Sequence, residues 1–458
     1  MTITYAGLPD RRRRGARFWV RPENLWAARR KLRVDHSVAW RQSYPSATLL
    51  APTSAVGPVN PARSVPMSRL VDQPVDGGVR FLILGDTGEG DVSQYATLPV
   101  IRALAPDFMV INGDVAYPAG REQDFLNGFF EPYRGLGIPI WAVPGNHEYY
   151  SSGKGKEFYH FFCDQDAASV WERHGLRFVP QPGTFWELRD DKLRLSVLAL
   201  DTGMKGNLDG DSPEEEDREQ HAWLLERLHQ AQEEQVKVIL LFHIPALAAR
   251  THLGRRTQPG RWQRLKERAT GKSTPALATL HRFVAAFPCV RLVVAGHDHN
   301  YQGYAPGTFA TYLHQEYGAL PAAAAPHYVV CGGGGAYPQT TAFKGGAYGC
   351  DLFPDDRQWR EYAGRWMGRK SALVSKVAAE LADADDGRFL SLLLVECQAG
   401  DPPTTTVTPV WVEDLRTVLF DPALPGGVHR VVDLTSPSTK VPATMLPRCL
   451  KAEARVVL

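Results

Sequence analysis

The chain contains five short apolar runs, and polar residues follow directly after each of them. The runs are residues 81–84, 107–112, 138–143, 236–242 and 289–295. Short apolar runs bounded by turn residues predict buried β-strands. In α/β proteins, ligands bind at the carboxyl ends of such strands. The pattern therefore predicts an α/β fold in which the polar residues after the strands gather at one edge of a sheet.

The polar residues after these runs are of the kinds that bind metal ions. In chain order they are Gly85-Asp86-Thr87-Gly88, Gly113-Asp114 with Tyr117, Gly145-Asn146-His147-Glu148, His243, and Gly296-His297-Asp298-His299. One Gly-Asp pair alone would indicate only a turn, and one histidine alone would indicate a core residue. Five strand ends of this kind are not explained by packing. Carboxylate, phenolate, amide oxygen and imidazole donors together suit zinc, iron and similar ions.

These motifs, in this order, resemble the calcineurin-like metallophosphoesterase superfamily. Most of its members carry a histidine two residues after the first aspartate, where this chain has Gly88, and the second motif here adds Tyr117. That exchange is similar to purple acid phosphatases, in which a tyrosine replaces the missing histidine as a ligand. The resemblance covers roughly residues 80–335. It implies a four-layer α/β/β/α sandwich of two mixed β-sheets flanked by helices.

The resemblance also implies a dinuclear metal site in which Asp114 bridges the two ions. One ion would be held by Asp86, Tyr117 and His299, and the other by Asn146, His243 and His297. The first site is anionic and would favour Fe(III), whereas the second suits Zn, Mn or Fe(II). Two such ions lower the pKa of a bound water, and the resulting hydroxide attacks phosphorus in line.

Two residues near these ligands have alternative interpretations. By resemblance, His147 contacts the phosphoryl group or protonates the leaving oxygen, which suits a side chain whose pKa lies near neutrality. The alternative is a turn histidine that is hydrogen-bonded to the backbone. Asp298 either orients a neighbouring ligand histidine or faces solvent.

The predicted function is hydrolysis of a small phosphorylated substrate, a phosphomonoester, by an acid-phosphatase-like enzyme with two metal ions. One alternative is a phosphodiesterase that acts on nucleotides or phospholipid headgroups, because the same metals serve both reactions. The second alternative is a non-catalytic regulatory protein on the same scaffold. Such proteins usually lose ligands, and the presence of all seven candidate ligands argues against this interpretation.

The composition of the chain mainly argues against other classes of protein. The formal net charge is +2, from 52 Lys and Arg against 50 Asp and Glu, so specific nucleic-acid binding is not expected. None of the six cysteines forms a C-x-x-C pair, which argues against a zinc ribbon or a thioredoxin-like site. The sequence contains no recognisable secretory signal and no apolar stretch of membrane-spanning length. We therefore expect a cytoplasmic protein.

The chain is expected to divide into three parts. Residues 1–78 form a basic arm and a Pro-rich linker, residues 79–420 form the catalytic domain, and residues 421–458 form a C-terminal tail. Insertions are expected at about 250–275 and 340–385. The first insertion is basic, and it is either a solvated surface or an aid to binding an anionic substrate. The second contains a predicted helix that packs in the core or, less favoured, contacts a membrane surface.

Further predictions concern the frame around the motifs. Helices are expected over 91–104 and from Ser212 onward, and strands over 389–396 and 405–412 are expected to complete the second sheet. Residues 332–335 are all glycine and predict a tight turn, with a close phosphate contact as the alternative. Tyr149 and Tyr150 either line the substrate mouth or lie in a flexible surface loop.

Overall fold

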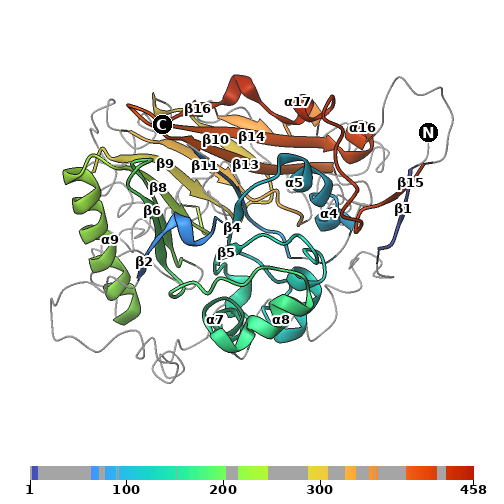
Figure 1. Cartoon of the computed structure of the whole chain (residues 1–458), viewed down its shortest axis with the longest axis horizontal. Helices are drawn as coiled ribbons and strands as arrows, with labels where there is room; N and C mark the ends of the chain where they lie inside the picture. The colour runs from blue at the N-terminus through green and yellow to red at the C-terminus, as the bar shows by residue number, and fades with distance from the viewer. Residues whose placement is uncertain are drawn as a thin grey trace, which may run out of the picture.

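The structure is a computed structural model in which two large β-sheets are stacked face to face and helices cover their outer faces (Figure 1). It describes residues 3–8, 63–71, 78–88, 90, 92–151, 153–202, 215–245, 287–307, 325–336, 350–355, 357–358, 388–419 and 430–458. The predicted α/β sandwich of two mixed sheets with flanking helices is confirmed.

The first sheet has six strands in the order β16-β14-β13-β3-β4-β5. They are β3 (Gly78–Leu84), β4 (Phe108–Asn112), β5 (Ile140–Val143), β13 (Arg388–Gln398), β14 (Thr404–Asp414) and β16 (Val456–Val457). Strands β3, β4 and β5 are parallel to one another, whereas β13 is antiparallel to β3 and to β14. The loops that follow β3, β4 and β5 therefore leave the sheet at the same edge.

The second sheet has eight strands in the order β12-β10-β11-β9-β8-β7-β6-β2. They are β2 (Ser64–Pro66), β6 (Trp186–Asp190), β7 (Leu195–Leu200), β8 (Lys237–Phe242), β9 (Val290–Ala295), β10 (Tyr301–Tyr304), β11 (His327–Cys331) and β12 (Asp351–Phe353). Strands β7, β8, β9 and β11 are parallel. Their carboxyl ends, like those of β3 to β5, form one edge.

The placement of β13 and β14 differs from the prediction. They were expected to complete the second sheet, but β13 pairs with β3 in the first, with Leu394 opposite Leu82. The reason is that apolar alternation identifies a strand but not its partner. Leu393 of β13 packs in the core between the sheets, and Leu392 packs in the core under the helices. Both faces are buried, as a central strand requires.

Three apolar layers hold the sandwich together. The middle layer lies between the sheets and includes Phe81 and Ile83 of β3 together with Ile239 and Leu241 of β8. One outer layer packs the alternate side of the first sheet against helices. In the other, the described residues that pack on the second sheet include those of a long helix, Glu215–Glu233. Successive strand residues point to opposite faces, so each central strand contributes to two layers.

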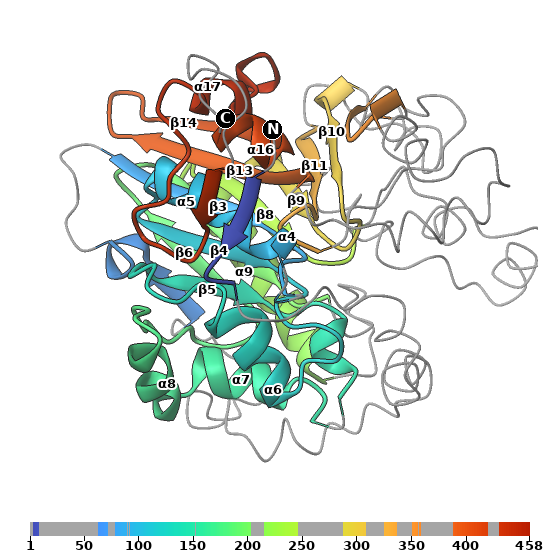
Figure 2. The same ribbon diagram turned by 90° about the vertical axis from the view of Figure 1, so that its right-hand side faces the viewer.

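Short helices cover the first sheet. They are α4 (Val92–Tyr95), α5 (Leu98–Leu104), α6 (Glu122–Phe125) with a following π-helix (Leu126–Phe130), α7 (Lys156–Cys163), α8 (Ala168–Arg173), α16 (Leu415–Leu419) and α17 (Leu446–Cys449). Figure 2 shows α6, α7 and α8 grouped beside β5. Short 3₁₀ turns occur at Met67–Arg69, His147–Tyr149, Gln165–Ala167 and Ala452–Ala454.

The single helix expected over 91–104 is two helices. Pro99 lies in the first turn of α5, where its missing N–H costs nothing. Within one continuous helix the same proline would remove a backbone hydrogen bond and clash with the preceding turn. The aromatic segment that follows is buried, with Phe125, Phe129 and Phe130 fully inside the core.

Helix α9 (Glu215–Glu233) lies along the outer face of the second sheet (Figure 1). Its buried residues recur at the spacing of one helix face and are Gln220, Trp223, Leu224 and Leu228. Its expected start at Ser212 lies outside the described residues. So do the basic insertion at about 250–275 and nearly all of the helix expected in the second insertion. Among the residues that the structure describes, no helix is long and apolar enough to cross a membrane.

Both ends of the chain contact the folded core. Strand β1 (Ile3–Ala6) pairs in parallel with β15 (Arg430–Asp433), and this pair faces the viewer in Figure 2. Farther along, the amide of Val441 donates to the carbonyl of Pro99 in α5 at 3.2 Å. Segments expected as an arm and a tail therefore include residues that pack on the core of the first sheet.

Candidate metal centre

The two sheets meet where β4 and β8 end. His243 follows β8, and its Nδ1 lies 3.0 Å from the carbonyl oxygen of Asn112, the last residue of β4. A carbonyl only accepts hydrogen bonds, so Nδ1 carries a hydrogen, and Nε2 is the nitrogen that a metal ion could bind. This contact orients the imidazole with Nε2 toward the loops that carry the candidate ligands, as outer contacts of metal-binding histidines do.

A first group of donors surrounds the Tyr117 hydroxyl. Its oxygen lies 3.2 Å from Asp86 Oδ1, 3.2 Å from Asp114 Oδ2 and 3.1 Å from His299 Nε2. His299 Nε2 also lies 3.3 Å from Asp86 Oδ1. A single hydroxyl hydrogen cannot satisfy two carboxylates and an imidazole nitrogen. A cation among these atoms would satisfy all of them, so the donor set fits a metal ion.

A second group adjoins the first through Asp114. Its Oδ2 lies 3.2 Å from His243 Nε2, and His243 Nε2 lies 3.3 Å from Asn146 Oδ1. Ligand atoms of Asp114, His243 and His297 all lie within 4.8 Å of one another. The same Asp114 oxygen therefore faces both groups, which is the position a bridging carboxylate requires. The structure thus brings all seven candidate ligands into one cluster.

The cluster is buried, and its electrostatics depend on that burial. Burial by itself would raise the pKa of Asp114, but the His243 and His147 imidazoles outweigh it and hold the pKa well below the usual range. Burial likewise disfavours charged His243, but the Asp114 carboxylate dominates and raises the pKa of His243. Without metal, then, a proton on His243 balances Asp114. Metal ligands must release such protons, so metal and proton compete for the imidazole.

The backbone at the cluster is strained. Asp86, Asp114 and His297 have positive φ values of 60°, 50° and 71°, a region that non-glycine residues seldom occupy. Hydrogen bonds hold this conformation: the amide of Asp86 donates to the carbonyl of Gly113 at 3.0 Å, and the amide of His297 donates to Asp86 Oδ2 at 2.7 Å. Each such residue costs of order 1–3 kcal/mol, and such strain clusters at functional sites.

The glycine that distinguishes the first motif has a steric explanation. A Cβ on Gly88 would lie 1.9 Å from the carbonyl oxygen of Val115. The amide of Tyr117 donates to the carbonyl of Gly88 at 3.0 Å, which draws the two loops together. No side chain fits at position 88 in this arrangement, and the Tyr117 hydroxyl lies beside Asp86 and His299 on this side of the cluster.

One nitrogen of His147 makes the backbone contact of the second interpretation, and the other nitrogen faces the cluster. Its Nδ1 donates to the carbonyl of Pro118 at 2.7 Å, which is a backbone contact. Its Nε2 faces the cluster, 3.8 Å from Asp114 Oδ2, and its side chain is 17% exposed. Burial is the largest influence on the pKa of His147 and lowers it, against the opposing effect of Asp114. The ring lies between those of Tyr117 and Tyr150, at 4.2 and 4.7 Å.

Glu148 is a site residue that sequence reasoning missed. Its two carboxyl oxygens accept hydrogen bonds from the amides of Ala116 at 2.9 Å and Gly145 at 2.6 Å. It is fully buried, and burial followed by the nearby Asp114 charge raises its pKa to about 8. Glu148 thus ties the loop after β4 to the loop after β5. Its position next to His147 in the third motif was the one feature of the sequence that could have indicated a role in the site.

The structure decides several remaining alternatives. Asp298 is fully buried, so the solvent-facing interpretation is wrong, and its Oδ2 lies 3.4 Å from Gln302 Nε2. Amides in the glycine run donate to protein carbonyls: Gly332 to Asn300 at 3.1 Å and Gly334 to Gly85 at 2.9 Å. These two amides are therefore not available to bind a phosphate, in agreement with the tight-turn interpretation.

The two tyrosines after the third motif are also held in place. Tyr149 is buried, and its hydroxyl donates to a carboxylate oxygen of Asp201 at the end of β7. The Tyr150 hydroxyl accepts a hydrogen bond from Asn146 Nδ2 at 2.5 Å. Both tyrosines therefore contact the centre or its surroundings, and neither matches the expectation of a flexible surface loop.

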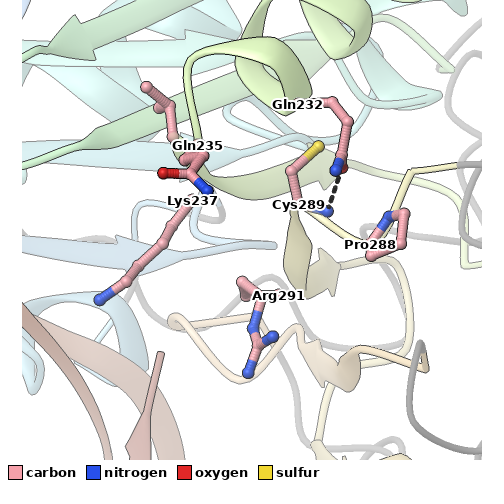
Figure 3. A pocket seen from close by; sticks show the side chains of 7 residues that line it. Gln232, Gln235, Lys237, Pro288, Cys289 and Arg291 are labelled. Carbon is pink, nitrogen blue, oxygen red and sulfur yellow. Dashed lines mark hydrogen bonds between the residues drawn. The ribbon is translucent and has the colours of Figure 1, made fainter.

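A separate cavity lies at the opposite end of the second sheet (Figure 3). It measures about 220 Å³ and is lined by residues at the amino-terminal ends of β8 and β9, among them Lys237, Cys289 and Arg291. His243 and His297 follow the carboxyl-terminal ends of the same two strands. The cavity is therefore not part of the metal centre.

Comparison with known proteins matches one family model to part of the chain. The model of the family described as calcineurin-like phosphoesterase matches residues 79–301, which contain all seven candidate ligands. Comparison with curated proteins found no match.

Three similar solved structures illustrate the range of matches. GAP50, the anchor in the inner membrane complex of Plasmodium, has 11% identity and a TM-score of 0.38, covering 79% of this chain and 93% of its own. A dimetal phosphatase from Danio rerio has 11% identity and a TM-score of 0.38, with 74% and 98% covered. The protein TT1561 of Thermus thermophilus has 16% identity and a TM-score of 0.31, with 57% and 92% covered.

Proposed function

We propose, for a chain that carries a calcineurin-like phosphoesterase domain over residues 79–301, that it hydrolyses phosphomonoesters with two metal ions in the manner of a purple acid phosphatase. Metal-dependent phosphoester hydrolysis follows from the family. The finer assignment is carried by one observation: the Tyr117 hydroxyl lies within 3.2 Å of Asp86, Asp114 and His299. This position of Tyr117 supports the inference from sequence that the tyrosine replaces the missing histidine as a metal ligand.

The residues divide into two sets that share Asp114. Asp86, Tyr117 and His299 would hold one ion, and Asn146, His243 and His297 the other. The phenolate and carboxylates of the first set favour Fe(III), while the second set suits Zn, Mn or Fe(II). When bound, two such ions lower the pKa of a water and neutralise charge on a phosphoryl group.

His147 is placed to handle a proton. Because Nδ1 is occupied by the Pro118 carbonyl, the proton that His147 gains or loses is the one on Nε2, which faces the cluster. A protonated Nε2 would donate to a phosphoryl oxygen or to the leaving oxygen of the ester. Burial by the Tyr117 and Tyr150 rings limits the access of bulk water to the imidazole.

The test is hydrolysis of an aryl phosphate monoester and the matching diester, side by side, by protein loaded with iron plus zinc or with manganese. We expect two ions per chain and a strong preference for the monoester. Preference for the diester would overturn the monoester assignment. Fewer than two ions per chain would overturn the dinuclear site. Two bound ions without hydrolysis of either ester would support a non-catalytic role instead.

A further inference from the structure

The side-chain amide of Asn146 has two different ends with two different partners. Its Oδ1 lies 3.3 Å from Nε2 of His243, on the side of the metal cluster. Its Nδ2 points the other way and donates to the hydroxyl oxygen of Tyr150 at 2.5 Å. Asn146 is only 7% exposed, so both ends need protein partners.

The two ends are not equivalent for metal binding. The amide oxygen has lone pairs to give to a cation, whereas the NH₂ group only donates hydrogen bonds. The two orientations of an amide are nearly identical in shape, so packing alone does not choose between them. The choice falls to the hydrogen-bond partners of each end. For the oxygen to face the cluster, the NH₂ group needs an acceptor on the far side.

We infer that Tyr150 is a positioning residue that holds the Asn146 amide oxygen toward the ion of the His243 side. The inference rests on the proposed function, because it concerns one of the two proposed metal sites. Tyr150 would not touch the ion or the substrate phosphoryl group itself. It acts through Asn146 by accepting the amide hydrogen, as outer partners of metal ligands do.

The local fold fixes Tyr150 in this role. The 3₁₀ turn His147–Tyr149 ends at Tyr150, whose amide donates to the carbonyl of His147 at 3.2 Å. That turn sends the Tyr150 side chain back over its own start, so the ring packs 4.7 Å from the ring of His147 and the hydroxyl reaches Asn146. Tyr149, one residue earlier, points instead to Asp201. The two adjacent hydroxyls are therefore directed at different parts of the site.

The first measurement is Zn²⁺ affinity, obtained by competition with a chelating dye for the metal-free full-length chain. We expect Tyr150→Phe to weaken one of two bound ions by about 10- to 100-fold and to leave the other within a few-fold. The matched control is Tyr159→Phe, which removes one tyrosine hydroxyl on helix α7 and is expected to leave both affinities within a few-fold. Thermal unfolding of both metal-free variants checks that each is folded.

A double-mutant cycle separates positioning from a general structural effect. If Tyr150 acts through Asn146, Tyr150→Phe produces no further loss of Zn²⁺ affinity in an Asn146→Ala background. An equal loss in both backgrounds would overturn the inference, as would unchanged affinity in Tyr150→Phe alone. Wild-type protein that binds fewer than two ions would instead overturn the proposed function, so the two failures are distinguishable.

Discussion

The hydroxyl oxygen of Tyr117 lies 3.1 Å from Nε2 of His299, a residue 182 positions later in the chain. Tyr117 belongs to the loop after β4 in the first sheet, and His299 belongs to the loop after β9 in the second. Their rings meet edge to face, with centroids 5.9 Å apart and planes at 90°. Donor atoms from both sheets therefore converge on one point, and an ion bound there would link the sheets.

Metal removal is therefore expected to lower the stability of the fold. A ligand that binds only the folded state stabilises it by about 2.7 kcal/mol at a hundredfold excess over its dissociation constant. We expect chelation to lower the thermal unfolding midpoint by several degrees and zinc or manganese to restore it. The measurement is calorimetry of the same sample before chelation, after chelation and after reloading. An unchanged midpoint in protein shown to bind metal would contradict the link between the sheets.

Replacing Tyr117 by Phe tests its role as an iron ligand. Iron-loaded protein should show a visible absorption band from charge transfer between tyrosinate and Fe(III), and Tyr117→Phe should abolish it. Activity should fall by about 10- to 100-fold or more, since even outer partners of metal ligands have effects of that size. Tyr159→Phe, on helix α7, is the control for loss of one hydroxyl elsewhere. A band that survives Tyr117→Phe would exclude Tyr117 as the ligand that produces it.

Position 88 should not tolerate a side chain. A Cβ there would meet the Val115 carbonyl oxygen at 1.9 Å, so Gly88→Ala must displace backbone. We expect a loss of about 1–3 kcal/mol in the free energy of unfolding, together with weaker metal binding. Gly307→Ala is the matched control, because no atom of the described residues lies within 4 Å of a Cβ at that position. Equal stability of the two variants in urea unfolding would refute the steric explanation.

Glu148→Gln tests the tie between the two motif loops. Glutamine has nearly the same shape, but its NH₂ group would face one of the two amide donors, Ala116 or Gly145, that a carboxylate accepts. We expect a loss of about 1–3 kcal/mol in the free energy of unfolding, because a buried donor is left unsatisfied. Glu131→Gln, in a partly exposed pair with Arg134, should change stability by about 0.5 kcal/mol or less. Denaturant unfolding of metal-free protein measures both, at about pH 9, where Glu148 with its pKa of about 8 is ionised.

Arg63 should stabilise the fold without affecting the metal centre. It is 5% exposed, its guanidinium donates to the Phe185 carbonyl at 3.2 Å, and it lies 3.6 Å above the Phe185 ring. Arg63→Ala removes these contacts and is expected to cost about 2–4 kcal/mol. Arg69→Ala, at an exposed position of the same segment, should cost about 0.5 kcal/mol or less. Altered zinc affinity in Arg63→Ala would show that its role extends beyond stability.

Arg63 also illustrates what sequence reasoning could not reach. It lies in the segment expected to be a Pro-rich linker, yet the described residues 63–71 contribute a strand and a buried cation to the second sheet. Its composition, rich in proline, predicts a segment with little regular secondary structure. It does not reveal that one arginine stacks on an aromatic ring 122 residues away.

The sequence by itself determined the strands and the chemistry at their ends. Apolar runs and the turn residues after them are local signals, so the positions of Asp86, Asp114, Asn146, His243, His297 and His299 at strand ends could be predicted. The replacement of the usual histidine by Gly88, together with the added Tyr117, could also be recognised, because both are residue types at known places in two motifs. Local periodicity carries this much information because each strand must bury its own side chains whatever its partners are.

Only the tertiary structure decided how these elements are joined. Three features depend on which segments lie next to one another. They are the pairing of β13 with β3, the two amide hydrogen bonds to Glu148, and the hydrogen bond from Asn146 to Tyr150. Even for Tyr149 and Tyr150, adjacent in sequence and identical in type, the direction of each hydroxyl follows from the turn that carries it. Strand partners and side-chain hydrogen bonds are set by the packing of the whole chain, which no local pattern records.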